Sequence, residues 1–353
     1  MTPRKISDAI PQILELSPAA AIPGGEITVR GTHFSSEGNP VARFGETAAT
    51  LVVGSDRLLI VRVPESLMDA ADGLTVGSNG SSSSPHACAV GVQIADGVHP
   101  VSNPAVDREG NVYATLSGSR GQKTPVSVYR VDVHTGKSSA LVSDITNATG
   151  LAYDRDGVLH VSSRHEGNVY RVTNAGNYSV FVEGMGVATG IAFDPHNNLY
   201  VGDRSGTIFK VSPERQIYVF ATLESSIAAY HLAFGPDGYL YVTGPTTSSY
   251  DAVQRISPAG EVEVFYRGLG RPQGLAFDAA GNLYVAASLA GRRGIVRITP
   301  SSGTQAPEAS LFLAGSGIVG LAFAPGGEVI VATHSVLYRV HAGVRGLGVE
   351  GRA

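Results

Sequence analysis

The sequence Gly190-Ile191-Ala192-Phe193-Asp194 decides the fold, because five close variants of it occur elsewhere in the chain. The variants begin at Asn103, Gly150, His231, Gly274 and Gly320. Their central alanines are separated by 47, 40, 41, 43 and 46 residues, at Ala105, Ala152, Ala192, Ala233, Ala276 and Ala322. This spacing is the period of one four-stranded β-propeller blade, so six copies predict six blades.

Each copy is followed by a turn and a second strand, as in Gly281-Asn282-Leu283-Tyr284. Five copies have glycine at the turn position that we expect to need a positive φ, and the remaining copy has Asn197, a residue type that tolerates it. A third predicted strand carries one basic residue per blade. Because one residue per blade cannot serve a single asymmetric site, we interpret these as architectural: Arg130, Arg171, Lys210, Arg255, Arg297 and Arg339.

The first 95 residues have a different pattern, in which short apolar runs alternate with Gly and Pro clusters. That pattern predicts a small β-sandwich. The segments Gly24 to Phe34, Phe44-Gly45 and Val61-Arg62-Val63-Pro64 resemble the immunoglobulin-like IPT/TIG family. The predicted fold is therefore all-β, with an N-terminal tail (1–10), an IPT/TIG immunoglobulin-like β-sandwich (11–95) and a C-terminal six-bladed β-propeller (96–349).

The repeats from about Val98 to Val340 resemble the NHL repeat and, more distantly, the gluconolactonase and senescence-marker-protein family. The resemblance implies a six-bladed propeller. In the gluconolactonase-like enzymes a Glu, two Asn and an Asp hold a divalent cation, mostly from the position before the first glycine of the repeat. Here that position is occupied by Ser102, Thr149, Thr189, Tyr230, Gln273 and Val319.

No carboxylate is present in that set, and Asn103 is the only nearby residue of a matching type. A hard cation needs several charged or amide oxygens. We therefore expect no metal and no cofactor, with calcium or zinc only if the chain is a lactonase-like enzyme. A second enzyme precedent, the virginiamycin-lyase-like propellers, uses histidine and glutamate near the mouth, where this chain has His165-Glu166 and His334.

Composition limits the partners. The formal net charge is −4 and 16% of residues are charged, so nucleic acid is an unlikely partner. Cys88 is the only cysteine, which rules out a disulfide within the chain and predicts a buried thiol. No apolar run is long enough for a signal-peptide core or a membrane span, so we expect a cytoplasmic protein with no membrane partner.

In a propeller blade the first strand starts at the face where the second strand ends. Residues at both points should therefore meet at one mouth of the central channel. The candidate ligand-binding residues are Asn103, Arg120, Thr149, Arg164, His165, Thr189, Asp203, Arg204, Tyr230, His231, Gln273, Arg292 and His334. His231 replaces the glycine of its repeat, which fits either a ligand-binding residue or a repacked blade. His160 takes the usual Tyr place in its second strand and is predicted to be a core residue.

We expect a binding or scaffold protein that recognises a small polar or anionic ligand, or a protein segment, at the mouth. The alternatives are a gluconolactonase-like hydrolase or lyase with a remodelled site, whose catalytic residues are undefined, and a nucleic-acid-binding NHL propeller. In the binding hypothesis Arg120, Arg164 and Arg204 hold the anion, and Asp203 orients a neighbouring arginine. The loop Ser117 to Pro125 would lie over the mouth.

Ring closure has two possible solutions. The sixth blade needs a fourth strand, from either Gly343 to Val349 or Val90 to Ala95. The C-terminal segment is favoured, because Val90 to Ala95 is assigned to the sandwich.

Overall fold

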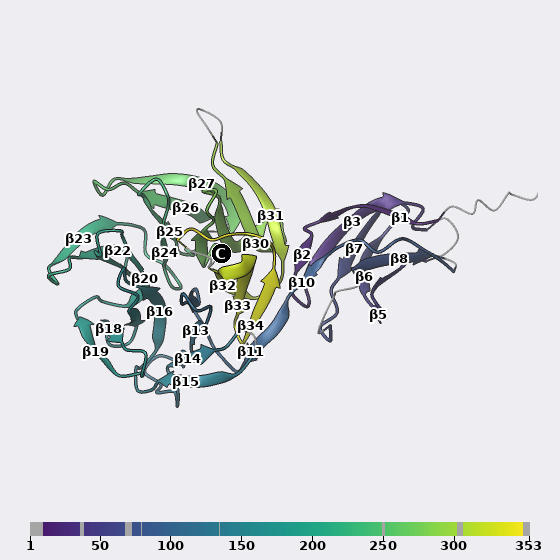
Figure 1. Ribbon diagram of the computed structural model, residues 1–353. Coiled ribbons are helices and arrows are strands. Elements are labelled where there is room, and N and C mark those ends of the chain that lie inside the picture. The colour runs from purple at the N-terminus through teal and green to yellow at the C-terminus, as the bar shows by residue number, and fades with distance from the viewer. Residues whose placement is uncertain are drawn as a thin grey trace, which may run out of the picture. The chain divides into compact units, whose positions relative to one another are not determined.

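The structure, a computed structural model, describes residues 10–35, 39–67, 73–78, 80–133, 135–248, 251–301 and 306–348. In these ranges the chain consists of β-strands and connecting turns, with one 3-10 turn, η1 (Pro325–Gly327) (Figure 1). None of the described residues belongs to a helix long and apolar enough to cross a membrane. The all-β prediction is confirmed.

The first part of the chain forms two four-stranded antiparallel sheets. One contains β1 (Gln12–Ser17), β3 (Glu26–Thr32), β7 (Leu58–Arg62) and β6 (Thr50–Gly54), and the other β5 (Thr47–Ala48), β4 (Val41–Phe44), β8 (Leu74–Ser78) and β9 (Ser81–Ser82). Alternate residues of both sheets, such as Ile27, Leu59 and Leu74, share one buried core. The short strands β2 (Ala20–Ala21) and β10 (Ala89–Val90) pair in parallel. The predicted sandwich is confirmed.

Two features of this core explain local sequence choices. A Cβ atom on Gly31 would lie 2.0 Å from the carbonyl oxygen of Gln12 and 2.4 Å from the ring of Phe34, so only glycine lets these strands approach. Cys88 is buried as expected, and burial raises the pKa of its thiol to about 12. The thiol therefore stays protonated and behaves as a small apolar group.

The rest of the described chain forms six four-stranded antiparallel blades around a ring (Figure 1). The first three, in order from the inner strand outward, are β12 (Ala105–Val106), β13 (Val112–Thr115), β14 (Val128–Val131), β15 (Ser138–Val142); β16 (Ala148–Tyr153), β17 (Leu159–Ser163), β18 (Asn168–Val172), β19 (Tyr178–Val182); and β20 (Ala188–Phe193), β21 (Leu199–Asp203), β22 (Thr207–Val211), β23 (Ile217–Thr222).

The last three blades are β24 (His231–Phe234), β25 (Leu240–Thr243), β26 (Asp251–Ile256), β27 (Val262–Gly270); β28 (Leu275–Phe277), β29 (Leu283–Leu289), β30 (Arg292–Thr299), β31 (Glu308–Ala314); and β32 (Ile318–Ala324), β33 (Glu328–Thr333), β34 (Val336–His341), β11 (Val92–Asp96). The turns between first and second strands have the predicted positive φ angles, including 66° at Asn197.

In five of the six blades an aromatic ring of the second strand contacts the neighbouring blade, and the sixth blade has Ile330 at this position. The ring of Tyr200 lies 5.0 Å from Phe220 in its own blade and 5.0 Å from Phe234 in the next blade, both edge to face. Its hydroxyl donates to Asp194 Oδ2 at 3.3 Å, and that carboxylate also accepts from the turn amides of His196 and Asn198. The basic residue of the third strand packs on the same ring, with Lys210 Nζ 5.6 Å from the centroid of Tyr200. This contact supports an architectural role for Lys210.

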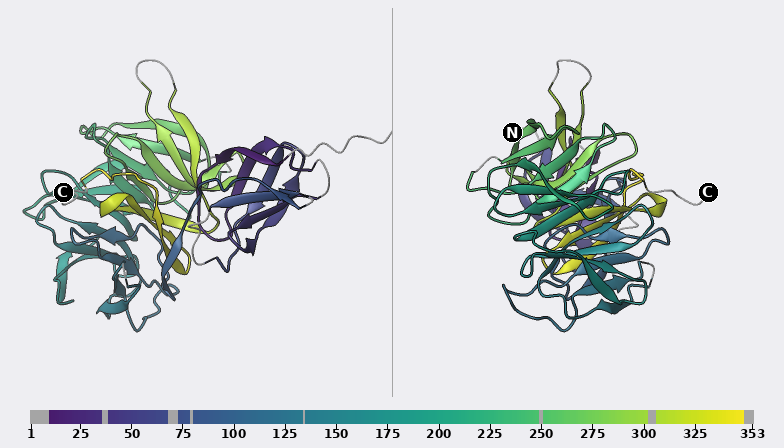
Figure 2. Two further views of the ribbon diagram at one scale, coloured as in Figure 1. Left: turned by 45° about the vertical axis from the view of Figure 1, so that its right-hand side comes forward. Right: turned by 90° about the vertical axis from the view of Figure 1, so that its left-hand side faces the viewer.

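The sixth blade is completed by β11, which pairs with β34. Figure 1 shows the blue strand β11 beside the yellow strand β34, and the turned views of Figure 2 agree. The expectation that Gly343 to Val349 supplies this strand is wrong. Gly346 instead bridges to Asp278, and Leu347 N donates to Phe277 O at 2.9 Å, both in the fifth blade. The ring is closed by a strand that precedes the first blade in sequence.

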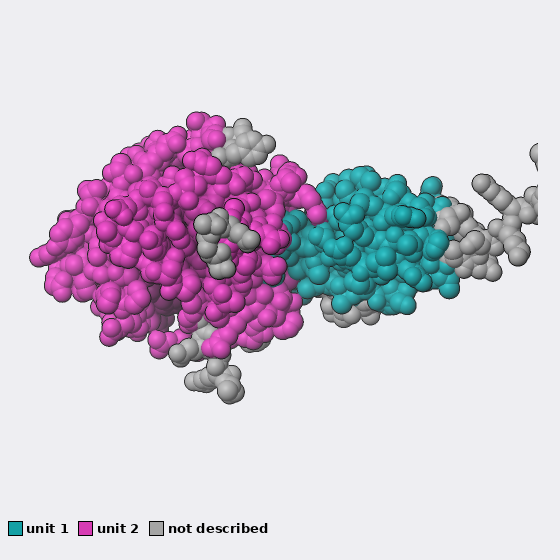
Figure 3. Space-filling model, turned by 90° about the horizontal axis from the view of Figure 1, so that it is seen from above, with its two compact units in different colours: residues 1–92, 311–316 teal, residues 93–310, 317–353 magenta. Residues whose placement is uncertain are grey.

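The chain divides into two compact units, residues 1–92 with 311–316 and residues 93–310 with 317–353 (Figure 3). The division falls close to the boundary expected between residues 95 and 96. Most of the expected N-terminal tail (1–10), and Val349 at the expected end of the propeller, lie outside the described residues.

Closure by β11 makes Ile94 a stability determinant. Its side chain is 5% exposed and shares a core cluster with Val112, Ile330 and Leu337. Ile94→Ala should therefore lower the free energy of unfolding by about 2–5 kcal/mol, measured by urea denaturation. The matched control is Gln93→Ala, at an exposed position of the same strand. Equal costs for the two substitutions would contradict closure by β11.

His160 occupies the bridging aromatic position of the second blade, which confirms it as a core residue. Its ring lies 4.9 Å from Phe181 and 4.8 Å from Phe193, and Nδ1 donates to Val158 O at 3.1 Å. Its Nε2 is buried without a hydrogen-bond partner among the described residues. Burial lowers the pKa of His160 below the ordinary histidine value.

His160→Tyr should reduce the sensitivity of the protein to acid. Because the folded pKa is depressed, the stabilising contribution of His160 is present above the unfolded pKa of about 6.5 and is lost as pH falls below it. Tyrosine does not titrate in this pH range. Its hydroxyl can donate to Asp154, as the tyrosines at this position in other blades donate to an Asp of their own turn. We expect a smaller loss of unfolding free energy between pH 7.5 and 5.5 than in the wild type. His196→Tyr, in an exposed turn, serves as control, and an unchanged loss in His160→Tyr would refute the account.

Candidate functional site

The mouth of the propeller is defined here as the face where first strands begin and second strands end. Arg164 and Arg204 occupy equivalent positions there on the second and third blades. Arg164 N donates to Asn147 O at 3.3 Å, and Arg204 N donates to Val187 O at 3.2 Å. In each case the turn after the second strand is tied to the residue before the first strand, which fixes where the arginine leaves the backbone.

The residues immediately before the repeated glycine are structural. Thr149 Oγ1 donates to Asn147 O at 2.9 Å, and Thr189 Oγ1 donates to Gly202 O at 2.8 Å, while both side chains are 1% exposed. Tyr230 is also buried, and its hydroxyl donates to Glu224 O. Burial, followed by the charges of Glu224 and Asp203, raises the pKa of Tyr230 to about 12. None of these side chains offers an ionised oxygen to a ligand.

This set does not fit the divalent cation of the gluconolactonase-like enzymes. The oxygens of Thr149 and Thr189 are committed to backbone partners, and Gln273 contributes one amide to the set. Among the described residues, no three His, Cys, Asp or Glu side chains gather closely enough to hold a metal ion. A calcium or zinc site would need several charged or amide oxygens at one point.

Two residues that replace the repeated glycine fill the centre of the ring. At this position in other blades a Cβ would collide with the next blade, as at Gly190, where it would lie 2.3 Å from Tyr230 O. The side chain of Asn103 instead bonds to two other inner strands: Nδ2 donates to Leu275 O at 2.8 Å, and Oδ1 accepts from Leu321 N at 3.2 Å. His231 Nδ1 lies 3.5 Å from Ser102 Oγ. Because Ser102 and His231 belong to the first and fourth of six blades, this contact crosses the ring. We call Ser102, Asn103 and His231 the plug.

The plug explains the broken repeat at His231. Its side chain is 1% exposed, and burial lowers the pKa of the imidazole to about 3. The ring is therefore neutral at physiological pH and packs against the opposite blade. The geometry favours the repacked-blade interpretation of His231 over a ligand-binding role.

His231→Gln should remove part of the acid instability of the protein. The folded pKa of about 3 lies below the unfolded value, so stability is intact above the unfolded pKa and falls with decreasing pH. A neutral buried histidine costs about 1.4 kcal/mol per pH unit below about pH 6.5. Urea unfolding at pH 7 and pH 5 should show a smaller difference for His231→Gln than for the wild type. His165→Gln, at an exposed mouth position, should behave as the wild type, and the idea fails if the two variants respond alike.

The loop Ser117 to Pro125 is held near the second blade by Asn147. Asn147 Nδ2 donates to Gly118 O at 2.7 Å and to Ser119 O at 2.9 Å, and its Oδ1 accepts from Gly121 N at 2.7 Å. Asn147 has a φ of 52°, which asparagine tolerates better than most residues. Sequence reasoning missed this residue, although its type immediately before an inner strand was a usable signal. Arg120, at the tip of the loop, is exposed.

Arg164 reaches the same loop. Its Nη2 donates to Gly118 O at 2.8 Å, while its Nε is buried without a hydrogen-bond partner among the described residues. Burial first, and the charge of Arg204 second, hold the pKa of Arg164 below its ordinary value. Arg204 is exposed, and its Nε donates to Ser226 O at 3.4 Å. Neither anchor uses more than one nitrogen of its guanidinium group.

Asp203 does not orient an arginine, contrary to the sequence-based expectation. Its Oδ1 accepts from Val187 N at 2.8 Å, and its Oδ2 accepts from Ser205 Oγ. Both bonds stabilise the turn that carries Arg204. The described residues show no ion pair between Asp203 and an arginine.

Of the remaining predicted residues, His165 lies next to Arg164, and the others belong to the fifth and sixth blades. His165 is exposed beside Gly121, Gln273 is half-buried on the fifth blade, and Arg292 starts β30 of that blade. His334 follows β33, and its carbonyl oxygen accepts from His99 Nδ1 at 2.9 Å. Burial, then the charges of His99 and Arg271, lower the pKa of His334. The structure thus places Arg164 and Arg204 at equivalent positions of adjacent blades, whereas Gln273, Arg292 and His334 lie on the fifth and sixth blades.

A small polar pocket also opens between the third and fourth blades. It has a volume of about 150 Å³ and is lined by residues that include Glu224, Tyr230, Asp251 and Arg267. Most small-molecule sites are larger, at about 300–1,000 Å³. Asp251 Oδ1 already accepts from Thr246 N and Oγ1, at 3.1 and 2.7 Å. We therefore place the candidate site at the two arginines.

Comparisons with known proteins agree with the architecture. Residues 11–88 match the IPT/TIG domain family. No curated protein matches the chain. Among solved structures, a structural-genomics protein to which gluconolactonase activity has been attributed has a TM-score of 0.59, with 18% identity over 73% of this chain and 94% of that chain.

Two further solved structures extend the comparison. A gluconolactonase from Xanthomonas campestris has a TM-score of 0.56, with 15% identity over 72% of this chain and 90% of its own. An auxiliary nutrient binding protein from Bacteroides thetaiotaomicron has a TM-score of 0.53, with 12% identity over 95% of this chain and 98% of its own. At these identities the likeness concerns the fold alone. Residues 11–88 thus form an IPT/TIG domain, and the chain that follows has the propeller fold that gluconolactonases share.

Proposed function

We propose that this protein is a binding protein whose propeller mouth holds a small anionic ligand between Arg164 and Arg204. The observation that carries the proposal is that these two arginines occupy equivalent positions on adjacent blades, and that Arg164 has a buried Nε without a hydrogen-bond partner among the described residues. A carboxylate or phosphate between them would accept charge-assisted hydrogen bonds and balance their positive charges.

The surroundings support a preformed site. The anchors at Gly118 and Ser226 use one nitrogen of each arginine, which leaves further N–H groups on both side chains. The loop held by Asn147 brings Arg120 and His165 to the same region, and neither carries a charge that opposes an anion. Since the plug fills the ring centre, the ligand would sit on the rim of the second and third blades and not in the channel.

The test is a thermal-shift panel of citrate, gluconate and glucose 6-phosphate, followed by calorimetric titration of the compounds that stabilise the protein. Arg164→Ala and Arg204→Ala should each weaken binding at least about tenfold, which is about 1.4 kcal/mol. The control is Arg108→Ala, in an exposed turn of the opposite face. A panel without any binder, or an affinity that survives both mouth substitutions within about threefold, contradicts the proposal.

A further inference from the structure

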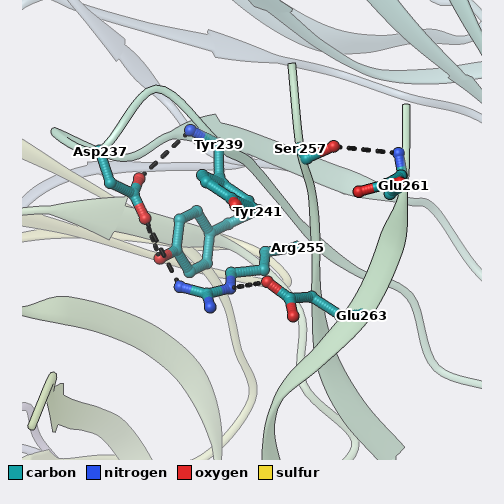
Figure 4. A network of polar contacts seen from close by, with 7 residues as sticks. All are labelled: Asp237, Tyr239, Tyr241, Arg255, Ser257, Glu261 and Glu263. Atoms are coloured by element: carbon teal, nitrogen blue, oxygen red, sulfur yellow. Dashed lines mark hydrogen bonds and ion pairs between the residues drawn. The ribbon is translucent and has the colours of Figure 1, made fainter. Parts of the chain in front are cut away.

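In the fourth blade the arginine of the third strand has a full set of partners, some of which are missing around the equivalent arginine of the second blade. In the fourth blade Arg255 Nε donates to Glu263 Oε1 at 2.7 Å, and a guanidinium nitrogen lies 3.7 Å from Asp237 Oδ2 (Figure 4). The guanidinium also packs on the ring of Tyr239, 4.7 Å from the centroid. One arginine thus holds two carboxylates and an aromatic ring.

The strand register identifies the corresponding residues of the second blade. Arg255 lies opposite Tyr241 and Glu263, and Arg171 lies opposite His160 and Ser179. The turn that provides Asp237 and Tyr239 has Asp156 and Val158 at the same places. The second blade therefore keeps the arginine and the first carboxylate but lacks the second carboxylate and the aromatic ring.

A groove of about 750 Å³ lies at this position. Its lining includes Asp156, Val158, Arg171 and Ser179, which correspond to Asp237, Tyr239, Arg255 and Glu263 of the fourth blade. Arg171 is exposed, and no other described residue holds its guanidinium in a hydrogen bond or ion pair. The groove lies on the propeller face that contains the turns between first and second strands, which is the face opposite the mouth.

The other side chains of the groove suit a polar ring. Asn174 and Asn177 are exposed at one wall, and neither side-chain amide is bonded to another described residue. Tyr178 belongs to the other face of this strand pair, where its ring stands edge to face against Tyr170 at 5.5 Å. Free amides donate to and accept from hydroxyl groups.

We infer that this groove binds a cyclic sugar acid. Its carboxylate takes the place of Glu263 and pairs with Arg171, and its hydroxyls bond Asn174 and Asn177. Asp156 does not exclude such a ligand, because Arg255 accommodates Asp237 and Glu263 at the same time. This site is separate from the mouth and does not depend on the proposed function.

The test titrates the full chain with glucuronate by calorimetry, with glucose and benzoate as comparison ligands. Glucuronate should bind, and Arg171→Ala should weaken it at least tenfold. Ser179→Glu should do the same, because it supplies the missing carboxylate from the protein itself. Ser139→Glu makes the same change opposite Arg130 in the first blade and should leave the affinity within twofold. Circular dichroism establishes that each variant is folded.

Each alternative result overturns the inference in a recognisable way. Absence of glucuronate binding, or full affinity in Ser179→Glu, excludes Arg171 as the anchor. Glucose or benzoate binding as tightly as glucuronate shows that the carboxylate or the hydroxyls are not recognised. Loss of glucuronate binding in Arg164→Ala with no effect of Arg171→Ala would assign the ligand to the mouth and reject the groove, leaving the proposed function intact.

Discussion

The propeller depends on one repeated interaction, in which an aromatic ring of the second strand contacts the next blade in five of the six blades. In the fourth blade Tyr241 contacts Phe265 of its own outer strand and Phe277 of the next inner strand, with centroids 4.9 and 4.8 Å away. Edge-to-face pairs of this kind add to the burial of apolar area. The hydroxyl donates to an Asp of the preceding turn, here Asp237 at 2.8 Å. A single side chain thus fixes the turn, the blade and the neighbouring blade.

This repeat made the fold predictable from sequence, whereas ring closure was not. The inner phrase, the turn glycine and the second-strand tyrosine recur because each blade must make the same contacts with the next. The segment Val92 to Asp96 contains none of these repeated residues. Its alternating apolar pattern is equally typical of a sandwich strand and of a propeller strand. Its partner β34 lies some 240 residues away in sequence. Pairing over that separation leaves no local pattern by which the two solutions could be told apart.

The candidate site was partly predictable for the same reason. Position in the repeat placed Arg164 and Arg204 on one face, because equivalent residues of adjacent blades occupy equivalent places. It could not show that Asp203 is bonded to Val187 and Ser205, nor that Asn147 anchors a loop from another blade. Those outcomes depend on side-chain hydrogen bonds within turns. The break at His231 was visible in sequence, but its contact with Ser102 spans the ring and has no signature in either repeat.

The side chains that depart from the repeat distinguish the blades of this propeller from one another chemically. The glycine position must stay small unless its side chain finds room between the inner strands. Asn103 does so by bonding to the fifth and sixth blades, and His231 by contacting Ser102 of the first blade. The second blade carries two arginines that differ from their counterparts in other blades. Arg164 has a buried Nε without a hydrogen-bond partner among the described residues, and Arg171 faces Ser179 where the fourth blade has Glu263. A cation that the fold holds in place with fewer carboxylate partners than its counterpart can pair with an anion from solution.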